Sequence, residues 1–129
     1  MSSDPSPVQI RILYRLVKTG TPTVRDFLSY TALGRRCPPG LSQHAWDGLS
    51  MFDTYRAAKA LALERGKTLG EFVAELHIPE DAPVTLEPPS KTGHCGLYNA
   101  EGGCPGEVEA SYLIERCLAR VVHAPSHAE

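Results

Sequence analysis

Several features that define common protein classes are missing from this chain of 129 residues. No segment approaches the ~20 consecutive apolar residues that a membrane-spanning helix needs. Residues 1–7 carry neither the basic stretch nor the apolar stretch of an export signal. A formal net charge of −2 gives no basic field for non-specific binding to nucleic acid or to an anionic membrane. We therefore expect a cytoplasmic protein with no membrane partner and no non-specific nucleic-acid binding.

Cysteine is scarce, and its positions do not form a recognised pattern. Cys37, Cys95, Cys104 and Cys117 are too few and too widely spread for a disulfide scaffold, so we expect them to be reduced. His94 precedes Cys95, but the Cys-x-x-Cys and His-x-x-x-His spacings of zinc sites are missing, and we predict no metal. Glycine-rich phosphate loops and the hydrolase elbow are also missing.

The composition that remains is that of one ordinary globular domain. Apolar residues make up 42% and charged residues 22% of the chain, which suits a single core, and the length leaves no room for a second domain. We predict a domain over residues 8–123. Residues 1–7 and 124–129 are expected to be a disordered lead-in and a disordered tail.

The clearest local pattern runs from Trp46 to Gly66. Residues 49–52 form a short apolar run, which predicts a strand. Asp53 or Thr54 can cap the helix that follows, and Gly66 stands where a left-handed C-terminal cap belongs. This stretch therefore predicts a strand, a cap, a helix and a stop.

Two elements are predicted before this stretch. The periodicity of residues 9–17 fits a helix or a strand, and the prolines upstream together with Gly20 downstream favour a strand. Thr21-Pro22 is typical of a helix start, so we predict a helix to about Leu33. Residues 34–45 are rich in helix breakers and predict a surface loop with one turn near its end. Loops of this length often lie over a cleft.

Several short strands are predicted after the helix. Residues 72–79 alternate apolar and polar positions and end at a proline, which predicts the clearest strand. Residues 84–87 predict a second strand, expected to be its neighbour, and residues 94–98 a third. Residues 107–112 fit a helix. For residues 113–123 we favour a strand, with one long helix as the alternative.

The predicted element order gives the fold class, α+β, with two main helices in the N-terminal half and strands late in the chain. Three stretches carry a resemblance to a known family: residues 12–17, residues 48–52 with the alanine-rich helix after them, and residues 72–79. A terminal hydrophobic strand completes it. Over about residues 8–123 the chain resembles small bacterial ADP-ribosyltransferase-like domains, of the rifampicin ADP-ribosyltransferase type and related uncharacterised proteins. The resemblance implies a split, curved β-sheet with a cleft for NAD.

The resemblance also implies a catalytic set. In one branch of the family an arginine on the first strand holds the NAD phosphates, a serine supports the ribose pocket, and a Glu-x-Glu pair supplies a glutamate that steadies the transition state. The matching residues here are Arg15, Ser50 and Glu109. A guanidinium fork suits a pyrophosphate and a carboxylate suits a ribosyl cation. The second hydroxyl of the family's Ser-x-Ser is missing, because Phe52 occupies that position.

Other residues complete the expected cofactor site. Arg11 lies on the same face of its strand as Arg15, so the two can act jointly. Other branches of the family use a histidine and a tyrosine; here His94 or His77 can take the first role, and Tyr98 or Tyr14 the second. The predicted NAD-binding residues are Arg11, Arg15, Ser50, His94 and Tyr98.

Two functional hypotheses follow. The first is an enzyme that transfers ADP-ribose from NAD to an unidentified acceptor. The second, favoured by the missing hydroxyl, is a non-catalytic module that binds a protein or small ligand through its proline-rich loops, with Trp46 and Arg35-Arg36 as contacts. Each proposed site residue also has a purely structural interpretation: Arg15 as a paired strand residue, and Glu109 as a first-turn acid favoured by the helix macrodipole.

Overall fold

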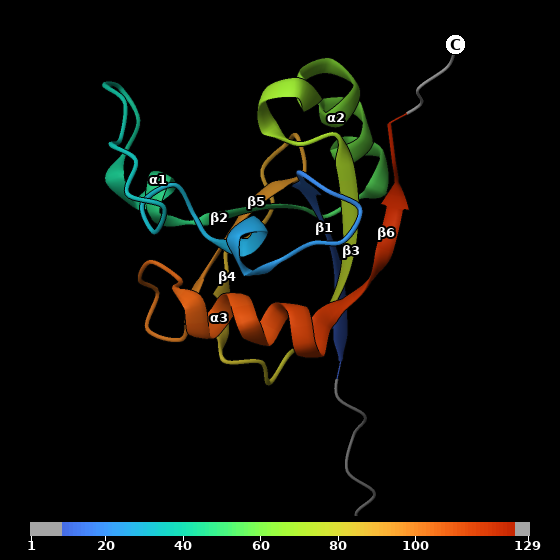
Figure 1. Cartoon of the computed structure of the whole chain (residues 1–129). Coiled ribbons are helices and arrows are strands. Elements are labelled where there is room, and N and C mark those ends of the chain that lie inside the picture. Colours follow the sequence, from blue (N-terminus) through green and yellow to red (C-terminus); the bar gives the residue numbers. More distant parts are fainter. Residues whose placement is uncertain (1–8, 126–129) are drawn as a thin grey trace, which may run out of the picture.

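Strand β1 (Ile10–Val17) lies at the centre of the sheet in the computed structural model, which describes residues 9–125 (Figure 1). The sheet is antiparallel and six-stranded, with the order β4-β5-β2-β1-β3-β6. The other strands are β2 (Leu49–Phe52), β3 (Phe72–Pro79), β4 (Val84–Leu86), β5 (His94–Asn99) and β6 (Leu118–His123). The predicted α+β class of a single domain is confirmed.

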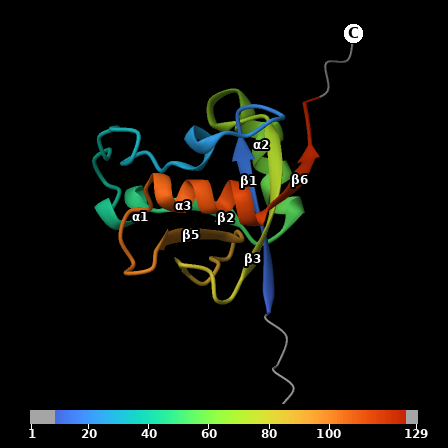
Figure 2. The same cartoon turned by 60° about the horizontal axis from the view of Figure 1, so that its bottom comes forward.

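The two longer helical segments cover opposite faces of this sheet, and the domain has three α-helices within residues 9–125. They are the short α1 (Gln43–Asp47), the long α2 (Tyr55–Leu69) and α3 (Glu107–Tyr112). Figures 1 and 2 show α2 and α3 on opposite sides of β1 and β3. Between residues 9 and 125, no helix has both the length and the apolar composition to cross a membrane.

Alternation along β1 divides the core between these two faces. Leu13 and Val17 are buried in the cluster that also contains Ala110 and Leu113 from the C-terminal helical segment. Leu16 points the other way and packs with residues of α2. Because successive strand side chains alternate between faces, one central strand supports both layers.

Helix α2 begins as predicted and ends later than predicted. Thr54 caps it by accepting a hydrogen bond from the backbone N–H of Ala57. The predicted stop at Gly66 is wrong: the chain kinks at Arg65, makes one more turn, and ends at Gly70, whose N–H donates to the carbonyl of Gly66. Gly70 has a φ of 133°, which a residue with a side chain rarely adopts.

The predicted helix over residues 21–33 is wrong. Only a single 3-10 turn, η1 (Val24–Phe27), forms there. The carboxylate of Asp26 accepts hydrogen bonds from the N–H groups of Thr23 and Lys18, which places the cap two residues later than Thr21. The carbonyl of Asp26, which a continuing α-helix would need, accepts a hydrogen bond from Arg15 instead. A side chain from β1 thus ends the helix after one turn.

The predicted pairing of residues 84–87 with residues 72–79 is also wrong. Strand β4 pairs with β5 at the far edge of the sheet. Strand β3 has no free edge for it, because β1 pairs along its whole length on one side and β6 on the other. Closeness in sequence was a poor guide here because the connection between β3 and β4 is not a tight hairpin turn.

The C-terminal segment combines both alternatives considered for residues 113–123. Helix α3 continues as a π-type turn, η2 (Leu113–Cys117), and β6 begins only at Leu118. Leu113 and Cys117 lie one helical turn apart and are both buried, so packing on the sheet favours the longer helix. The expectation of two main helices in the N-terminal half is therefore wrong, since α2 lies mid-chain and α3 near the end.

A buried carboxylate on β3 predicts acid sensitivity. Glu75 is 7% exposed, accepts a hydrogen bond from His77 Nε2, and lies 3.5 Å from Arg120 Nε on β6. The hydrogen bond from His77 is the main cause that lowers the pKa of Glu75. A group whose pKa is lower in the folded state stabilises the fold above its unfolded pKa and loses that contribution as the pH falls through the folded value.

We therefore expect the free energy of unfolding to fall when the pH is lowered from about 7 to about 3, and to fall less in Glu75→Gln. At pH 7 the variant should be less stable by about 1–3 kcal/mol, the range for a hydrogen-bonded charged group. Urea titrations at several pH values measure both quantities. Equal acid dependence in the two proteins would show that Glu75 is not the responsible group.

Candidate functional site

Strands β1 and β2 meet at one point and then separate. Their register shows a single pair, Tyr14 with Phe52. Beyond it the side chain of Arg15 spans the gap: Nε donates to the carbonyl of Asp26 at 2.8 Å, and Nη1 donates to the carbonyl of Ser50 at 2.8 Å. The guanidinium therefore connects β1, β2 and η1 where the backbone ladder is interrupted.

This bridging arginine also supplies a fixed positive charge. Burial lowers the pKa of Arg15 to about 10, while Tyr30 and Asp26 act in the opposite direction. The group stays protonated at neutral pH. Its two hydrogen bonds do not use all the N–H donors of a guanidinium, so further donors can meet a ligand.

A cavity of about 120 Å³ lies in the gap between β1 and β2. Its polar wall contains Arg15, Ser50 and His94, contributed by β1, β2 and β5. Its other lining residues come from residues 28–30, α2 and the three strands: Leu16, Leu28, Ser29, Tyr30, Gly48, Leu49, Phe52, Leu61 and Leu69. We call this space the inner cavity. The structure thus brings together three of the predicted site residues in a cavity with a mixed polar and apolar lining.

Ser50 and His94 form a direct pair on the wall of the inner cavity. His94 Nε2 lies 3.1 Å from Ser50 Oγ. In the antiparallel pairing of β2 with β5, Ser50 lies opposite Gly96 and His94 opposite Phe52, so the two side chains are diagonal neighbours on one face. Burial is the main cause that lowers the pKa of His94, against an opposite influence of Glu87. The imidazole is therefore neutral at neutral pH and can accept a proton.

A second, larger space of about 340 Å³ adjoins the first, sharing Arg15, Leu28, Tyr30 and other lining residues with it. We call it the outer cleft. Basic residues on its walls outnumber acidic ones by four to one: Arg15, Lys18, Arg25 and Arg35 against Asp26. Such a surplus on concave walls attracts anions more strongly than the same charges on a flat surface.

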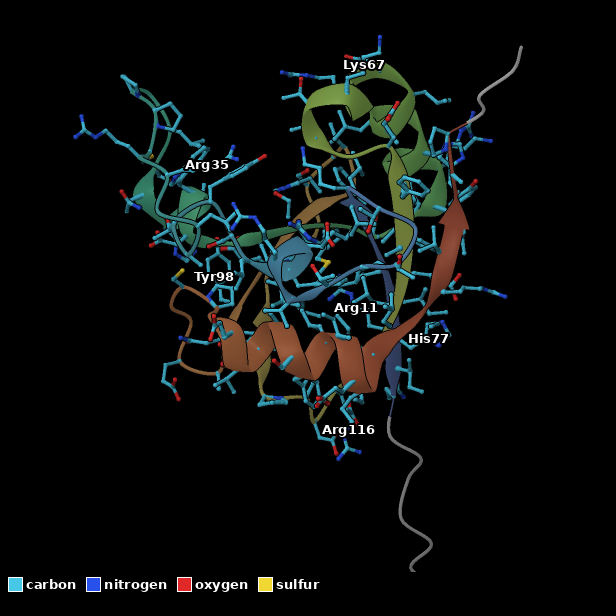
Figure 3. All side chains as sticks on the ribbon, viewed as in Figure 1. Arg11, Arg35, Lys67, His77, Tyr98 and Arg116 are labelled. Carbon is cyan, nitrogen blue, oxygen red and sulfur yellow. The ribbon has the colours of Figure 1, made fainter. Side chains whose placement is uncertain are left out.

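The breaker-rich loop after η1 positions one of these charges. The indole N–H of Trp46 donates to the carbonyl of Arg35 at 2.9 Å, and the Trp46 ring stacks on Tyr30 with centroids 4.5 Å apart. The guanidinium carbon of Arg35 lies 5.5 Å from the Tyr30 ring centroid. Figure 3 labels Arg35 on this loop, beside α1. The prediction of a surface loop is confirmed, and the loop contributes directly to the cleft wall.

Glu109 is not part of this site. Its Oε1 accepts a hydrogen bond from the N–H of Gly106 at 2.7 Å, so it caps the first turn of its own helix. It lines neither the inner cavity nor the outer cleft. Arg15, Ser50 and Glu109 therefore do not line one cleft, and the first-turn interpretation of Glu109 describes its observed contact.

Two other residues expected to bind NAD lie elsewhere. Arg11 lines an open groove between β1, β3 and β4, so it does not join Arg15 in the cavity. Tyr98 is 2% exposed; its ring stacks on His44 with centroids 4.3 Å apart, and its hydroxyl donates to the carbonyl of His44. Burial is the main cause that raises the pKa of Tyr98 to about 12. Figure 3 shows Arg11 and Tyr98 well apart.

Glycine makes room for the buried Tyr98 ring. A Cβ on Gly48 would lie 2.7 Å from Tyr98 Cζ, and a Cβ on Gly96 would lie 2.8 Å from Tyr98 Cε2.

The alternative pairing of His77 with Tyr14 is not formed either, because His77 binds Glu75 on β3. Tyr14 instead packs against the ring of Tyr55.

Sequence reasoning missed the residues that η1 and the following turn bring to the cleft. Arg25 and Tyr30 line it, and Lys18, which directly follows β1, lines it as well. The prediction of a helix over residues 21–33 gave no indication that this segment forms a cleft wall. Within residues 9–125, no group of three His, Cys, Asp or Glu side chains is placed to hold a metal ion.

Comparisons with family models, curated proteins and solved structures gave no match for this chain. What the fold and site define is therefore a class: an α+β domain with a small polar-and-apolar cavity opening into a basic cleft. No match supports membership of the ADP-ribosyltransferase-like family, which stays a prediction from residues 12–17, 48–52 and 72–79.

Proposed function

We propose that this chain binds a phosphate-bearing small molecule in the outer cleft, and that NAD, which the resemblance implies, is the first ligand to test. The observation that carries the proposal is the surplus of basic residues, four against one, on the walls of a concave space. Guanidinium groups bind phosphate oxygens through paired, charge-assisted hydrogen bonds. Arg15 links the two parts of the site, because it lines both.

The volumes of the two spaces determine which part of a ligand each can hold. At about 120 Å³ the inner cavity is too small for a dinucleotide, since ligand pockets usually measure about 300–1,000 Å³. The outer cleft, at about 340 Å³, falls within that range. A ligand that uses both would place its phosphates against the basic walls and a small ring or chain in the inner cavity.

Binding is better supported than ADP-ribosyl transfer. Transfer needs a carboxylate beside the ribosyl cation, and Asp26 is the one carboxylate on the cleft walls. Both of its oxygens are engaged, Oδ1 by the N–H of Lys18 and Oδ2 by the N–H of Thr23. The geometry thus favours ligand binding over ADP-ribosyl transfer. Transfer to an unidentified acceptor remains the second candidate because Arg15 and Ser50 share one cavity.

Thermal unfolding with and without ligand tests the proposal. A ligand that binds only the folded state stabilises it by RT ln(1 + [L]/Kd), so about 1 mM NAD at a Kd of about 0.1 mM contributes about 1.4 kcal/mol. For a domain of this size we expect a midpoint increase of about 3–6 °C. Nicotinamide riboside, which has no phosphate, should give no increase, and high salt should reduce the effect of NAD.

Two neighbouring arginines provide a matched pair of variants. Arg35 lines the outer cleft, whereas Arg36 is equally exposed on the same loop and does not. Arg35→Gln should weaken NAD binding about tenfold, the loss of one charge-assisted contact, and Arg36→Gln should leave it unchanged. No midpoint shift with millimolar NAD, ATP or ADP-ribose would refute the proposal, and so would equal effects of the two variants.

A further inference from the structure

The inner cavity combines three features that together describe a reaction site. A serine hydroxyl on β2 lies within hydrogen-bond distance of a histidine nitrogen on β5. An arginine charge is fixed beside them through its bond to the carbonyl of the same serine. A small space with a partly apolar lining adjoins the pair. A nucleophile, a base, a cation and an acyl-sized space are the components of acyl transfer through a covalent intermediate.

We propose that Ser50 and His94 act as nucleophile and general base on an ester whose small acyl group occupies the inner cavity. The identity of the leaving alcohol rests on the proposed function: it would carry the phosphate that the outer cleft binds. The acyl group is limited by the cavity, because about 120 Å³ is slightly less than a dry apolar cavity of about 150 Å³ that admits benzene. A short acyl chain fits such a space.

The chemistry proceeds in two balanced steps. Ser50 Oγ attacks the ester carbonyl carbon while His94 Nε2 takes the hydroxyl proton, and a tetrahedral oxyanion forms. The carbon–oxygen bond to the alcohol then breaks, and His94 returns the proton to the leaving oxygen, which leaves acyl-Ser50. Water attacks the acyl-Ser50 with His94 again accepting the proton. The bond between the acyl carbon and Ser50 Oγ then breaks, and His94 returns the proton to Ser50 Oγ, so the carboxylic acid departs and the Ser50 hydroxyl is restored.

Arg15 is placed to stabilise the oxyanion that forms in these reaction steps. Its Nη1 is held on the carbonyl of Ser50, so its charge lies beside the backbone of the nucleophile and lines the same cavity. A fixed positive charge in a partly apolar site stabilises a developing oxyanion without reorganisation. Among residues 9–125, no carboxylate is hydrogen-bonded to the His94 ring, so the pair should react more slowly than a complete triad.

A neutral fluorophosphonate probe applied to the full chain tests the pair without depending on the basic cleft. We expect one covalent adduct by intact mass, located on Ser50 by peptide mapping. Ser50→Ala should abolish it, and His94→Gln should slow it at least about 100-fold. Ser90→Ala, which removes an exposed hydroxyl hydrogen-bonded only to Thr92, serves as the matched control and should label like the unmodified chain.

The pH profile separates a base from a merely structural histidine. Because burial lowers the pKa of His94, labelling should be constant above neutral pH and should decline only at acid pH, as the imidazole is protonated. Ser50→Ala and His94→Gln should both keep the thermal midpoint of the unmodified chain, since both residues are partly exposed to solvent and their side chains bond to each other. No adduct after hours with millimolar probe, or an adduct that survives Ser50→Ala, would overturn the proposal.

Ligand protection distinguishes this inference from the proposed function. If NAD or another phosphate ligand occupies the cleft, it should slow labelling, and Arg35→Gln should remove the protection without removing the labelling. Labelling of Ser50 without any thermal shift would support the reactive pair and refute the phosphate site. A thermal shift without labelling would support the phosphate site and refute the reactive pair.

Discussion

Replacing Gly70 by alanine should lower the free energy of unfolding by about 3–5 kcal/mol, the sum of backbone strain and overpacking. Gly70 ends α2 with a φ of 133°, outside the conformations open to alanine. A Cβ there would lie 2.7 Å from the carbonyl oxygen and 2.9 Å from the carbonyl carbon of Val17. Those atoms belong to the backbone of the central strand, which cannot move aside as a flexible side chain can.

Gly40→Ala is the matched control for this prediction. Gly40 also has a positive φ, 87°, but no atom lies within 4 Å of an added Cβ. Its substitution should cost about 1–2 kcal/mol, which is the left-handed backbone penalty alone. Urea unfolding of both variants measures the difference. Equal losses would show that the contact with Val17 contributes nothing.

Arg15→Met should lower the free energy of unfolding by about 3–5 kcal/mol, because two hydrogen bonds to a charged donor are lost, each contributing about 1.5–3 kcal/mol with incomplete additivity. The carbonyl groups of Asp26 and Ser50 would lose the donor that connects η1 and β2 to β1. Methionine keeps much of the aliphatic length, so the change isolates the guanidinium. The same variant should also lose the ligand-induced thermal shift.

Arg15→Lys separates charge from geometry in this prediction. Lysine keeps the positive charge but places one nitrogen at the end of a flexible chain, so it cannot span both carbonyl groups as the planar fork does. We expect most of the stability loss of Arg15→Met to persist, with some phosphate binding retained. Urea titrations and thermal shifts with NAD provide the two readouts. A loss below about 0.5 kcal/mol in Arg15→Met would mean that the bridge is not structural.

Local patterns predicted well those elements whose signals are complete within a few residues. Strands β2 and β3 and the start of α2 at Thr54 occur where the sequence placed them. Pro79 ends its strand because it has no amide for the ladder. In each case the determining interaction lies within one element.

Elements that depend on a distant partner were predicted poorly. The helix expected over residues 21–33 fails because Arg15, on another strand, takes the carbonyl of Asp26. Strand β4 joins β5 because β1 and β6 already occupy both edges of β3. Local periodicity predicts neither the loss of the helix nor the pairing of β4 with β5. Both arise because segments remote in sequence compete for the same hydrogen-bonding groups.

The candidate site shows the same difference between residues that local patterns place correctly and residues whose contacts only the fold decides. Arg15, Ser50 and His94 were identified as site residues by resemblance to a family, and the structure places them on one cavity. Glu109 was named with them and lies elsewhere, because its carboxylate satisfies the N–H of Gly106 at the start of its own helix. A spacing in sequence cannot show whether a polar group is already engaged by its neighbours.

The sequence by itself determined the α+β class, the alternation that gives β1 two buried faces, and the start of α2, because periodicity and N-capping act over a few residues. Only the tertiary structure decided that β1 and β2 separate after one residue pair, that Arg15 bridges the gap, and that a cavity opens there with a basic cleft beside it. Those outcomes depend on which segments compete for the same edge and the same carbonyl groups, and that competition exists only when the chain is folded.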